Sequence, residues 1–264
     1  MRLGDIEIVP LSDGDFFARP EFFGLDADFT SHQQLLDATG ALRLPIGVFA
    51  LRGADGVTLV DAGIGPVNNA MFAGGQLLAD MKRHGIVEAE IREVICTHLH
   101  PDHVGWVVRK QDLSPVFPNA RVIVHAADWN FFVDQRGQDM EQHVVDGLLR
   151  LAESNRVTLF TGDATVRSGV NLLATPGHTP GHSIVVVSSG QQRVLLLGDA
   201  ITCPLQLQEA DWGAISDVDP LLAKRTREAL WRELENPASM GAGAHFPGLQ
   251  FGRVLRAHGR RWSV

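Results

Sequence analysis

The 264-residue sequence predicts a single domain that mixes helices and strands, of the α/β or α+β class. Three observations point to this class. Short runs rich in β-branched and aliphatic residues recur along the whole chain. Segments with helical spacing of apolar residues lie between these runs. No repeat, low-complexity tract or polar linker divides the sequence, so we expect residues 1–264 to form one domain.

Eight runs are predicted to be strands, because Gly, Asp or Pro bounds most of them. In chain order they are 6–9, 46–51, 57–60, 93–96, 121–124, 170–174, 183–188 and 193–197. Several of these runs are followed directly by polar residues, among them Asp61, His98 and Asp199. Functional side chains often lie on loops just past rigid strand ends, so this recurrence is the first indication of a site.

Helices are predicted over 68–83, 126–135 and 140–153, and a last one begins at Pro220. The last helix has the clearest boundaries. Asp219 is a good N-cap, and Pro220 suits the first helical position because it needs no backbone N–H there. Apolar residues follow at helical spacing, and Pro237 ends the helix.

The composition excludes several classes of protein. Lys and Arg total 23 against 31 Asp and Glu, which gives a net charge of −8. This acidic balance argues against nucleic acid as a partner and against docking on anionic membranes. With 45% hydrophobic residues, 20% charged residues and two cysteines, the chain is neither disordered nor a disulfide scaffold. The apolar stretches are too short to cross a membrane, and the amino terminus lacks the apolar core of a secretory signal. We therefore expect a cytoplasmic protein.

Four potential metal ligands, His98, His100, Asp102 and His103, fall within six residues directly after a predicted strand. Neutral imidazole and carboxylate suit Zn²⁺, and they also suit Mn²⁺, Fe²⁺ and Co²⁺. The alternative is a solvated polar loop, but such a density of histidine serves no stabilising purpose. Further candidates follow at the ends of later predicted strands and in turns: His178, Asp199 and His245. Each of these three is weak evidence alone.

Together these residues resemble the motifs of the metallo-β-lactamase superfamily. The segment from His98 to His103 matches its H-x-H-x-D-H signature, and the other motifs follow in the family's order over about residues 46–248. Asp61, His178, Asp199 and His245 match the remaining motifs. The resemblance implies an α+β fold, a four-layer αβ/βα sandwich in which two mixed β-sheets face each other with helices outside and a two-metal site at one edge.

The resemblance also implies which residues bind two divalent metal ions, with Zn²⁺ expected first and Mn²⁺, Co²⁺ or Fe²⁺ as alternatives. One ion would be bound by His98, His100 and His178. The other would be bound by Asp102, His103 and His245, and Asp199 would bridge the two.

In such a site a metal-bridging hydroxide is the nucleophile, and Asp102 or Asp199 relays a proton to the leaving oxygen. Asp61 is implied to accept the far N–H of a ligating histidine, which fixes its tautomer. His182, four residues after His178, is assigned a structural or supporting role.

Features outside the ligand set narrow the chemistry. Asp199 stands where the main zinc β-lactamases carry cysteine, which argues against antibiotic hydrolysis. The segment that follows His98 and the segment from Trp212 to Pro220 most resemble the branch with N-acyl homoserine lactonases and methyl parathion hydrolase. Those lactonases place a tyrosine three residues after the bridging aspartate, where this chain has Thr202 and contains no tyrosine at all. This departure favours a phosphotriesterase-like enzyme or a general esterase or lactonase.

Several alternatives stay open at this point. Within the fold they are a glyoxalase II-like thioesterase and a mononuclear iron oxygenase, and outside catalysis a binding or sensor protein. We expect a small-molecule substrate, and a homodimer from the family alone. Thr202, Trp106 and Phe22 are candidate substrate contacts, although ordinary packing competes for both aromatic residues. Phe22 belongs to a group of four phenylalanines, 16, 17, 22 and 23, expected to precede the first core strands.

Overall fold

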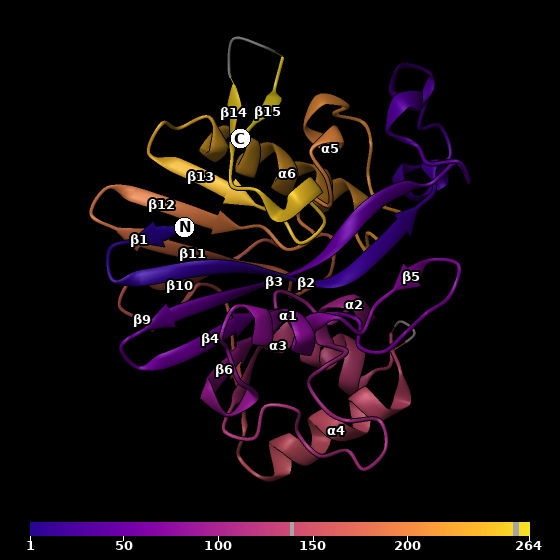
Figure 1. Cartoon of the computed structure of the whole chain (residues 1–264). Coiled ribbons are helices and arrows are strands. Elements are labelled where there is room, and N and C mark those ends of the chain that lie inside the picture. The colour runs from indigo at the N-terminus through magenta and orange to yellow at the C-terminus, as the bar shows by residue number, and fades with distance from the viewer. Residues whose placement is uncertain (138–139, 256–258) are drawn as a thin grey trace.

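The computed structural model describes residues 1–137, 140–255 and 259–264. Two β-sheets pack against each other, and helices cover both outer faces of the pair (Figure 1). In Figure 1, α1, α3 and α4 lie on one side of the strands, and α5 and α6 lie on the other. This is the sandwich of mixed sheets with outer helices that the sequence motifs imply, so the predicted α+β fold class is confirmed.

The first sheet has eight strands in the order β1-β2-β3-β4-β6-β7-β8, with β5 paired to β2. Pairing is antiparallel from β1 to β4 and parallel from β4 to β8. The strands are β1 Arg2–Leu3, β2 Ile6–Ala18, β3 Leu42–Gly53, β4 Gly56–Val60, β5 Phe72–Ala73, β6 Ile91–Ile95, β7 Arg121–His125 and β8 Val157–Phe160.

The second sheet has five strands in the order β13-β12-β11-β10-β9. Only the β12–β13 pair in it is parallel. Its strands are β9 Ala164–Arg167, β10 Val170–Ala174, β11 Ser183–Ser189, β12 Gln192–Leu196 and β13 Ser239–Ala242. A separate two-stranded sheet pairs β14 Arg253–Leu255 with β15 Arg261–Ser263.

The α-helices are α1 Leu77–Arg83, α2 Pro101–Val104, α3 Ala126–Asp128, α4 Gln142–Glu153, α5 Leu205–Gln208 and α6 Pro220–Leu234. α3 continues into a π-helical segment, η4 Trp129–Asp134. Short 3-10 turns lie at η1 Pro20–Phe23, η2 Thr30–Leu35, η3 Glu88–Glu90 and η5 Pro247–Leu249. The predicted cap of α6 is present, because the side chain of Asp219 accepts a hydrogen bond from the backbone N–H of Leu222. No helix in the described ranges is long and apolar enough to cross a membrane.

The layers follow from the alternation of side chains along the strands. In β12, Val194 and Leu196 face the apolar core between the two sheets, whereas Leu195 faces α6. On the opposite side of the molecule, α1 and α4 bury their apolar faces against the first sheet. A strand that is apolar on both faces must be covered on both faces, and this requirement fixes the four layers.

Three predictions of local structure need correction. The helix predicted over 68–83 begins only at Leu77, because Gly74 and Gly75 interrupt it, the latter with φ of 94°, and β5 lies before them. Seven short strands were not predicted, since each has only two to four residues and so shows little alternation; they are β1, β5, β8, β9, β13, β14 and β15. Phe16 and Phe17 lie within the first long strand, β2, rather than ahead of it.

Candidate metal centre

The seven predicted metal ligands lie just past strand ends or in the turns between strands. They are His98, His100, Asp102, His103, His178, Asp199 and His245. The chain after β6 supplies the first four through a loop and the first turn of α2. The loop between β10 and β11 and the turns after β12 and β13 supply the other three. Parts of the chain nearly 150 residues apart therefore meet at one place.

Local sequence explains the tight turn of the metal loop. Pro101 occupies the first position of α2, where a missing N–H costs nothing. α2 then ends at Gly105, whose amide donates a hydrogen bond to the carbonyl of Gly63. A Cβ at Gly105 would overlap the backbone of Ile64. Glycine is thus needed for the close approach that turns Asp102 and His103 inward.

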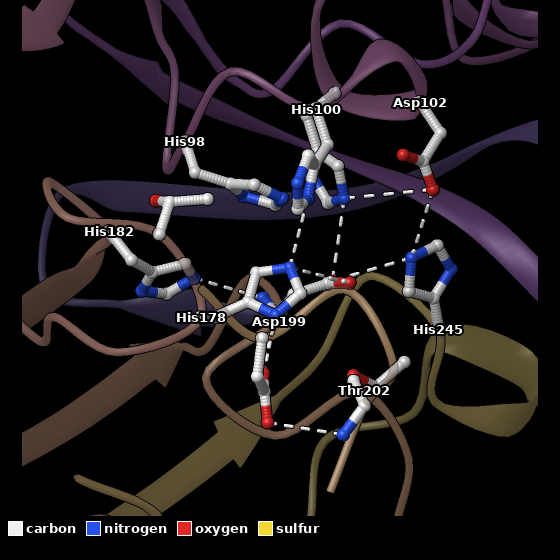
Figure 2. A network of polar contacts seen from close by, with 12 residues as sticks. His98, His100, Asp102, His178, His182, Asp199, Thr202 and His245 are labelled. Atoms are coloured by element: carbon white, nitrogen blue, oxygen red, sulfur yellow. Dashed lines mark hydrogen bonds and ion pairs between the residues drawn. The ribbon is translucent and has the colours of Figure 1, made fainter. Parts of the chain in front are cut away.

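The ligand atoms form three overlapping groups, and within each group they all lie within 4.8 Å of one another. Figure 2 shows these side chains facing one another, with Asp199 among them. The groups are His98, His100 and His178; His98, His103 and Asp199; and Asp102, His103 and His245. The structure thus brings together every one of the predicted ligands. Two of the groups have the same members as the two sets that the resemblance implies, and the third joins His98 and His103 with Asp199.

Asp199 lies between the two outer groups. Its Oδ1 atom lies 3.4 Å from Nε2 of His103 and 3.3 Å from Nε2 of His245. Its Oδ2 atom lies 3.7 Å from Nε2 of His178. One carboxylate oxygen therefore faces each group, which is the geometry of a bridging carboxylate.

Four of the histidines have their far ring nitrogen occupied. His98 Nδ1 contacts Oγ1 of Thr97, His103 Nδ1 contacts Oδ2 of Asp61, His178 Nδ1 contacts Oδ1 of Asp217 and His245 Nδ1 contacts the carbonyl of Pro45, at 2.7–3.1 Å. Each of these acceptors favours a proton on Nδ1 and leaves the Nε2 lone pair free. Neutral imidazole in this tautomer is the form that binds metal.

Asp61 accepts hydrogen bonds from two residues, His103 and Thr97. Besides His103, it accepts from the backbone N–H and the hydroxyl of Thr97, at 2.7–3.0 Å. Its backbone has φ of 66°, a left-handed conformation that aspartate tolerates better than most residues. The sequence-based role for Asp61 matches this contact with His103.

The inward-facing atoms fit a metal centre. Among the described residues, His98 Nε2, His103 Nε2, His245 Nε2 and Asp199 Oδ1 are buried without a hydrogen-bond partner. Buried polar atoms are almost always paired, so several unpaired nitrogens that converge on one point require another explanation. Imidazole nitrogens with carboxylate oxygens form a donor set for a divalent transition metal such as zinc.

The histidines and carboxylates of the centre shift one another's pKa values. Burial lowers the pKa of His245, but the carboxylates of Asp199 and Asp102 outweigh burial and raise that pKa above its usual range. Burial likewise raises the pKa of Asp199, but the nearby His245 and His103 hold it well below the ordinary value. The centre therefore keeps its carboxylates ionised, as metal ligands must be.

His182 lies behind the centre. Its Nε2 atom accepts the backbone N–H of Asp199 at 3.0 Å, and its Nδ1 atom lies 2.8 Å from the hydroxyl of Thr175. Neither ring nitrogen is free, so His182 supports Asp199 and does not join the ligand groups. This agrees with the supporting role predicted for it.

The three candidate substrate contacts differ in placement. Thr202 is fully buried, and its hydroxyl has no hydrogen-bond partner. Phe22 packs half-buried in an aromatic cluster, 5.1 Å from the ring of Phe16. Trp106 lines a cavity of about 720 Å³ beside the metal loop, which Pro101 and Phe72 also line. The indole N–H of Trp106 donates to Oδ1 of Asp13 at 2.8 Å.

Three buried polar residues near the site, Asp217, Arg227 and Asp128, were not predicted from the sequence. Asp217 accepts from His178, and Arg227 from α6 donates to its other oxygen at 3.1 Å. Burial raises the pKa of Asp217, but His178 and Arg227 outweigh burial and lower it.

Asp128 accepts from Thr179 and Gly181 in the loop that carries His178. Asp128 and Arg227 stand outside every motif, whereas Asp217 lies in the segment from Trp212 to Pro220, whose resemblance to the lactonase branch was the available signal.

Comparisons with known proteins agree with this geometry. The family model described as the metallo-beta-lactamase superfamily matches residues 43–235. An N-acyl homoserine lactonase of Bacillus thuringiensis is 29% identical over 228 residues, which cover 78% of this chain and 84% of that protein. A probable metallo-hydrolase of Mycobacterium tuberculosis is 25% identical over 169 residues, 55% of this chain and 53% of that protein.

Among the similar solved structures, two that match 100% of this chain are as follows. One is the hydrolase AbOPH of the beta lactamase superfamily, with a TM-score of 0.86 and 22% identity over 94% of its length. The other is AidC, a dizinc quorum-quenching lactonase in complex with a product, with a TM-score of 0.85 and 22% identity over 95% of its length. At this identity the likeness shows a shared fold. Since the family model spans most of the sequence, the chain belongs to the metallo-beta-lactamase superfamily.

Proposed function

We propose that the protein is a hydrolase that uses two divalent metal ions, most simply Zn²⁺, to cleave a lactone or a related ester. One observation carries the proposal: the two oxygens of Asp199 face two separate groups of ligand atoms. A structural zinc site needs one closed set of four ligands and no bridging carboxylate. Two adjacent groups that share a carboxylate suit a catalytic pair of ions.

Metal ions in such a pair supply Lewis acidity and lower the pKa of water, so that a nucleophile forms near neutral pH. The side chains of the protein set the spacing of the two ligand groups and transfer the proton. Asp199 and the histidines fix the spacing of the two groups. Asp102 keeps about a tenth of its surface exposed, and its Oδ2 atom lies 3.3 Å from Nε2 of His245. We assign to Asp102 and Asp199 the transfer of a proton to the leaving oxygen.

The substrate class follows from the relatives and the cavity. Six relatives named N-acyl homoserine lactonase are 28–29% identical to this chain. The cavity beside the metal loop is lined mainly by apolar side chains, among them Ile64, Val67, Phe72 and Trp106. We therefore propose a small neutral lactone or ester with an apolar part. We also propose a cytoplasmic location and a homodimer.

The test is a substrate panel with metal analysis. The purified protein, loaded in turn with Zn²⁺, Mn²⁺, Co²⁺ and Fe²⁺, is assayed on lactones, aryl esters, thioesters and phosphotriesters. We expect about two equivalents of metal, lactone or ester cleavage under anaerobic conditions, and loss of both metal and activity in His100→Ala. Fewer than one equivalent after loading, with His100→Ala unchanged, would overturn the proposal.

The same panel distinguishes the alternatives. Thioester cleavage above all other activities would favour a glyoxalase II-like enzyme. Activity that requires oxygen and a single iron would favour an oxygenase. Preference for phosphotriesters would fit Thr202 in place of a tyrosine.

A further inference from the structure

We infer that Asp217, held by Arg227, is a positioning residue that sets the metal affinity of the group formed by His98, His100 and His178. The inference rests on the proposed metal-dependent function. Asp217 is not among the predicted site residues, although it lies in the segment from Trp212 to Pro220, in the loop between α5 and α6. Its side chain is fully buried, and its Oδ1 atom lies 2.8 Å from Nδ1 of His178.

The loop fixes the Asp217 carboxylate against His178 from both ends. The backbone N–H of Val218 donates to the carbonyl of His178 at 3.0 Å, and the N–H of Asp219 donates to that of Gly177 at 2.9 Å. The N–H of Ala214 donates to Oδ2 of Asp217. The two loops therefore move as one unit, and the imidazole ring cannot turn without breaking the bond to Asp217.

Arg227 explains why a buried carboxylate persists at this position. It lies on the buried face of α6 with Ala223, Leu230 and Leu234. Its side chain is 7% exposed. An apolar residue would pack there at lower cost, because burying a charge is expensive. The guanidinium instead donates to Oδ2 of Asp217 at 3.1 Å. The ion pair stabilises the charged carboxylate of Asp217, which can then accept the Nδ1–H of His178.

The consequence is specific to one group of ligands. The proton that Asp217 holds on Nδ1 directs the Nε2 lone pair of His178 toward Nδ1 of His100, 3.0 Å away. In the same group, Nδ1 of His98 contacts a neutral hydroxyl, that of Thr97, at 3.1 Å. In the other group the direct carboxylate contact is made by Asp61, to His103. Loss of the Asp217 charge should therefore weaken one metal site and spare the other.

The experiment is a stepwise titration of metal-free protein with Zn²⁺ against a chromophoric chelator, together with Co²⁺ absorption spectra. Asp217→Asn is expected to weaken one of two dissociation constants by 10- to 100-fold and to leave the other within about threefold. The matched control is Asp219→Asn, two residues away, which keeps its capping oxygen and should leave both constants unchanged.

A second variant separates the lost carboxylate from the orphaned arginine. In Asp217→Asn/Arg227→Met both charges are gone, so selective weakening should persist. Wild-type affinity in this double variant would overturn the inference, as would equal weakening of both sites in Asp217→Asn. Failure of the wild type to bind two Zn²⁺ ions would instead overturn the proposed function on which the inference rests.

Discussion

The backbone N–H of Asp199 donates a hydrogen bond of 3.0 Å to Nε2 of His182, a residue that lies outside the ligand groups. Because that nitrogen accepts, the proton of the neutral ring sits on Nδ1, which donates to the hydroxyl of Thr175. Burial lowers the pKa of His182 well below its usual range, which keeps the ring neutral. Asp199 is thereby held in place through its own backbone N–H.

Replacement of His182 by alanine should test this link. His182→Ala leaves the buried Asp199 amide unpaired and opens a cavity, and we expect a loss of about 2–4 kcal/mol in the free energy of unfolding. Urea denaturation of the metal-free protein measures the change. His84→Ala is the control, because that side chain is 43% exposed, and it should change stability by less than about 0.5 kcal/mol. Equal effects of the two variants would contradict the supporting role.

Asp128 should give stability a pH dependence. Burial raises its pKa to about 6, although hydrogen bonds from Thr179 and Gly181 oppose the rise. An unfolded aspartate titrates near 3.9, so between about pH 4 and pH 6 the folded state binds more protons than the unfolded state. The contribution of Asp128 therefore falls as pH rises through this window, by about 2–3 kcal/mol in total.

Asp128→Asn stays neutral throughout that window and provides the measurement. The difference in unfolding free energy between variant and wild type should move in favour of the variant by about 2–3 kcal/mol from pH 4 to pH 7. Taking the difference cancels all other titrating groups to first order. A difference that stays constant with pH would mean that Asp128 has an ordinary pKa in the folded state.

Much of this molecule could be predicted from its sequence. The ligand residues stand in compact motifs, and motif order specifies which chain segments meet. The strands β10, β11 and β12 have runs of apolar residues that indicate extended backbone directly.

The rest depends on contacts that no local pattern records. Asp13 accepts from the amides of Ile64, Gly65 and Leu77 and from Trp106, all at least 51 residues away. Asp217 and Arg227 form their pair only after α6 docks on the second sheet. Such partners are set by tertiary packing, so a sequence pattern at either residue gives no warning of them.

Metal binding should stabilise the fold. Free Zn²⁺ at one hundred times a site's dissociation constant adds about 2.7 kcal/mol per site, which for a chain of this size corresponds to a rise of roughly 5–10 °C in Tm. Differential scanning fluorimetry measures the rise. Mg²⁺ is the control, because it prefers oxygen ligands and should give little change with this histidine-rich set. A rise in Tm with Mg²⁺ as large as that with Zn²⁺ would contradict the proposed centre.

Trp106→Phe should separate packing from substrate binding. The change removes the hydrogen bond from the indole to Asp13, at a cost of about 1 kcal/mol in stability. If Trp106 also contacts the apolar part of the substrate, KM should rise severalfold with kcat little changed. Trp231→Phe is the matched control, because the buried indole N–H of Trp231 has no hydrogen-bond partner within the described part of the chain. An unchanged KM would confine Trp106 to packing.

Thr202 stands three residues after Asp199, where the lactonases that the sequence resembles have a tyrosine. Its backbone N–H donates to Oε1 of Gln206, but its buried hydroxyl has no hydrogen-bond partner among the residues that the structure describes. Thr202→Val keeps the shape of the side chain and removes this unpaired group, so stability should stay the same or rise by up to about 1 kcal/mol.

If the hydroxyl bonds the substrate, Thr202→Val should also lower kcat/KM by about tenfold, the value of one hydrogen bond. Thr202→Ser retains the hydroxyl and should keep most of the activity. Stability from thermal unfolding and kcat/KM on the best lactone or ester give the two readouts separately. Full activity in Thr202→Val would show that substrate turnover does not depend on the Thr202 hydroxyl. The substrate would then be bound by other groups, namely the metal centre and the apolar cavity.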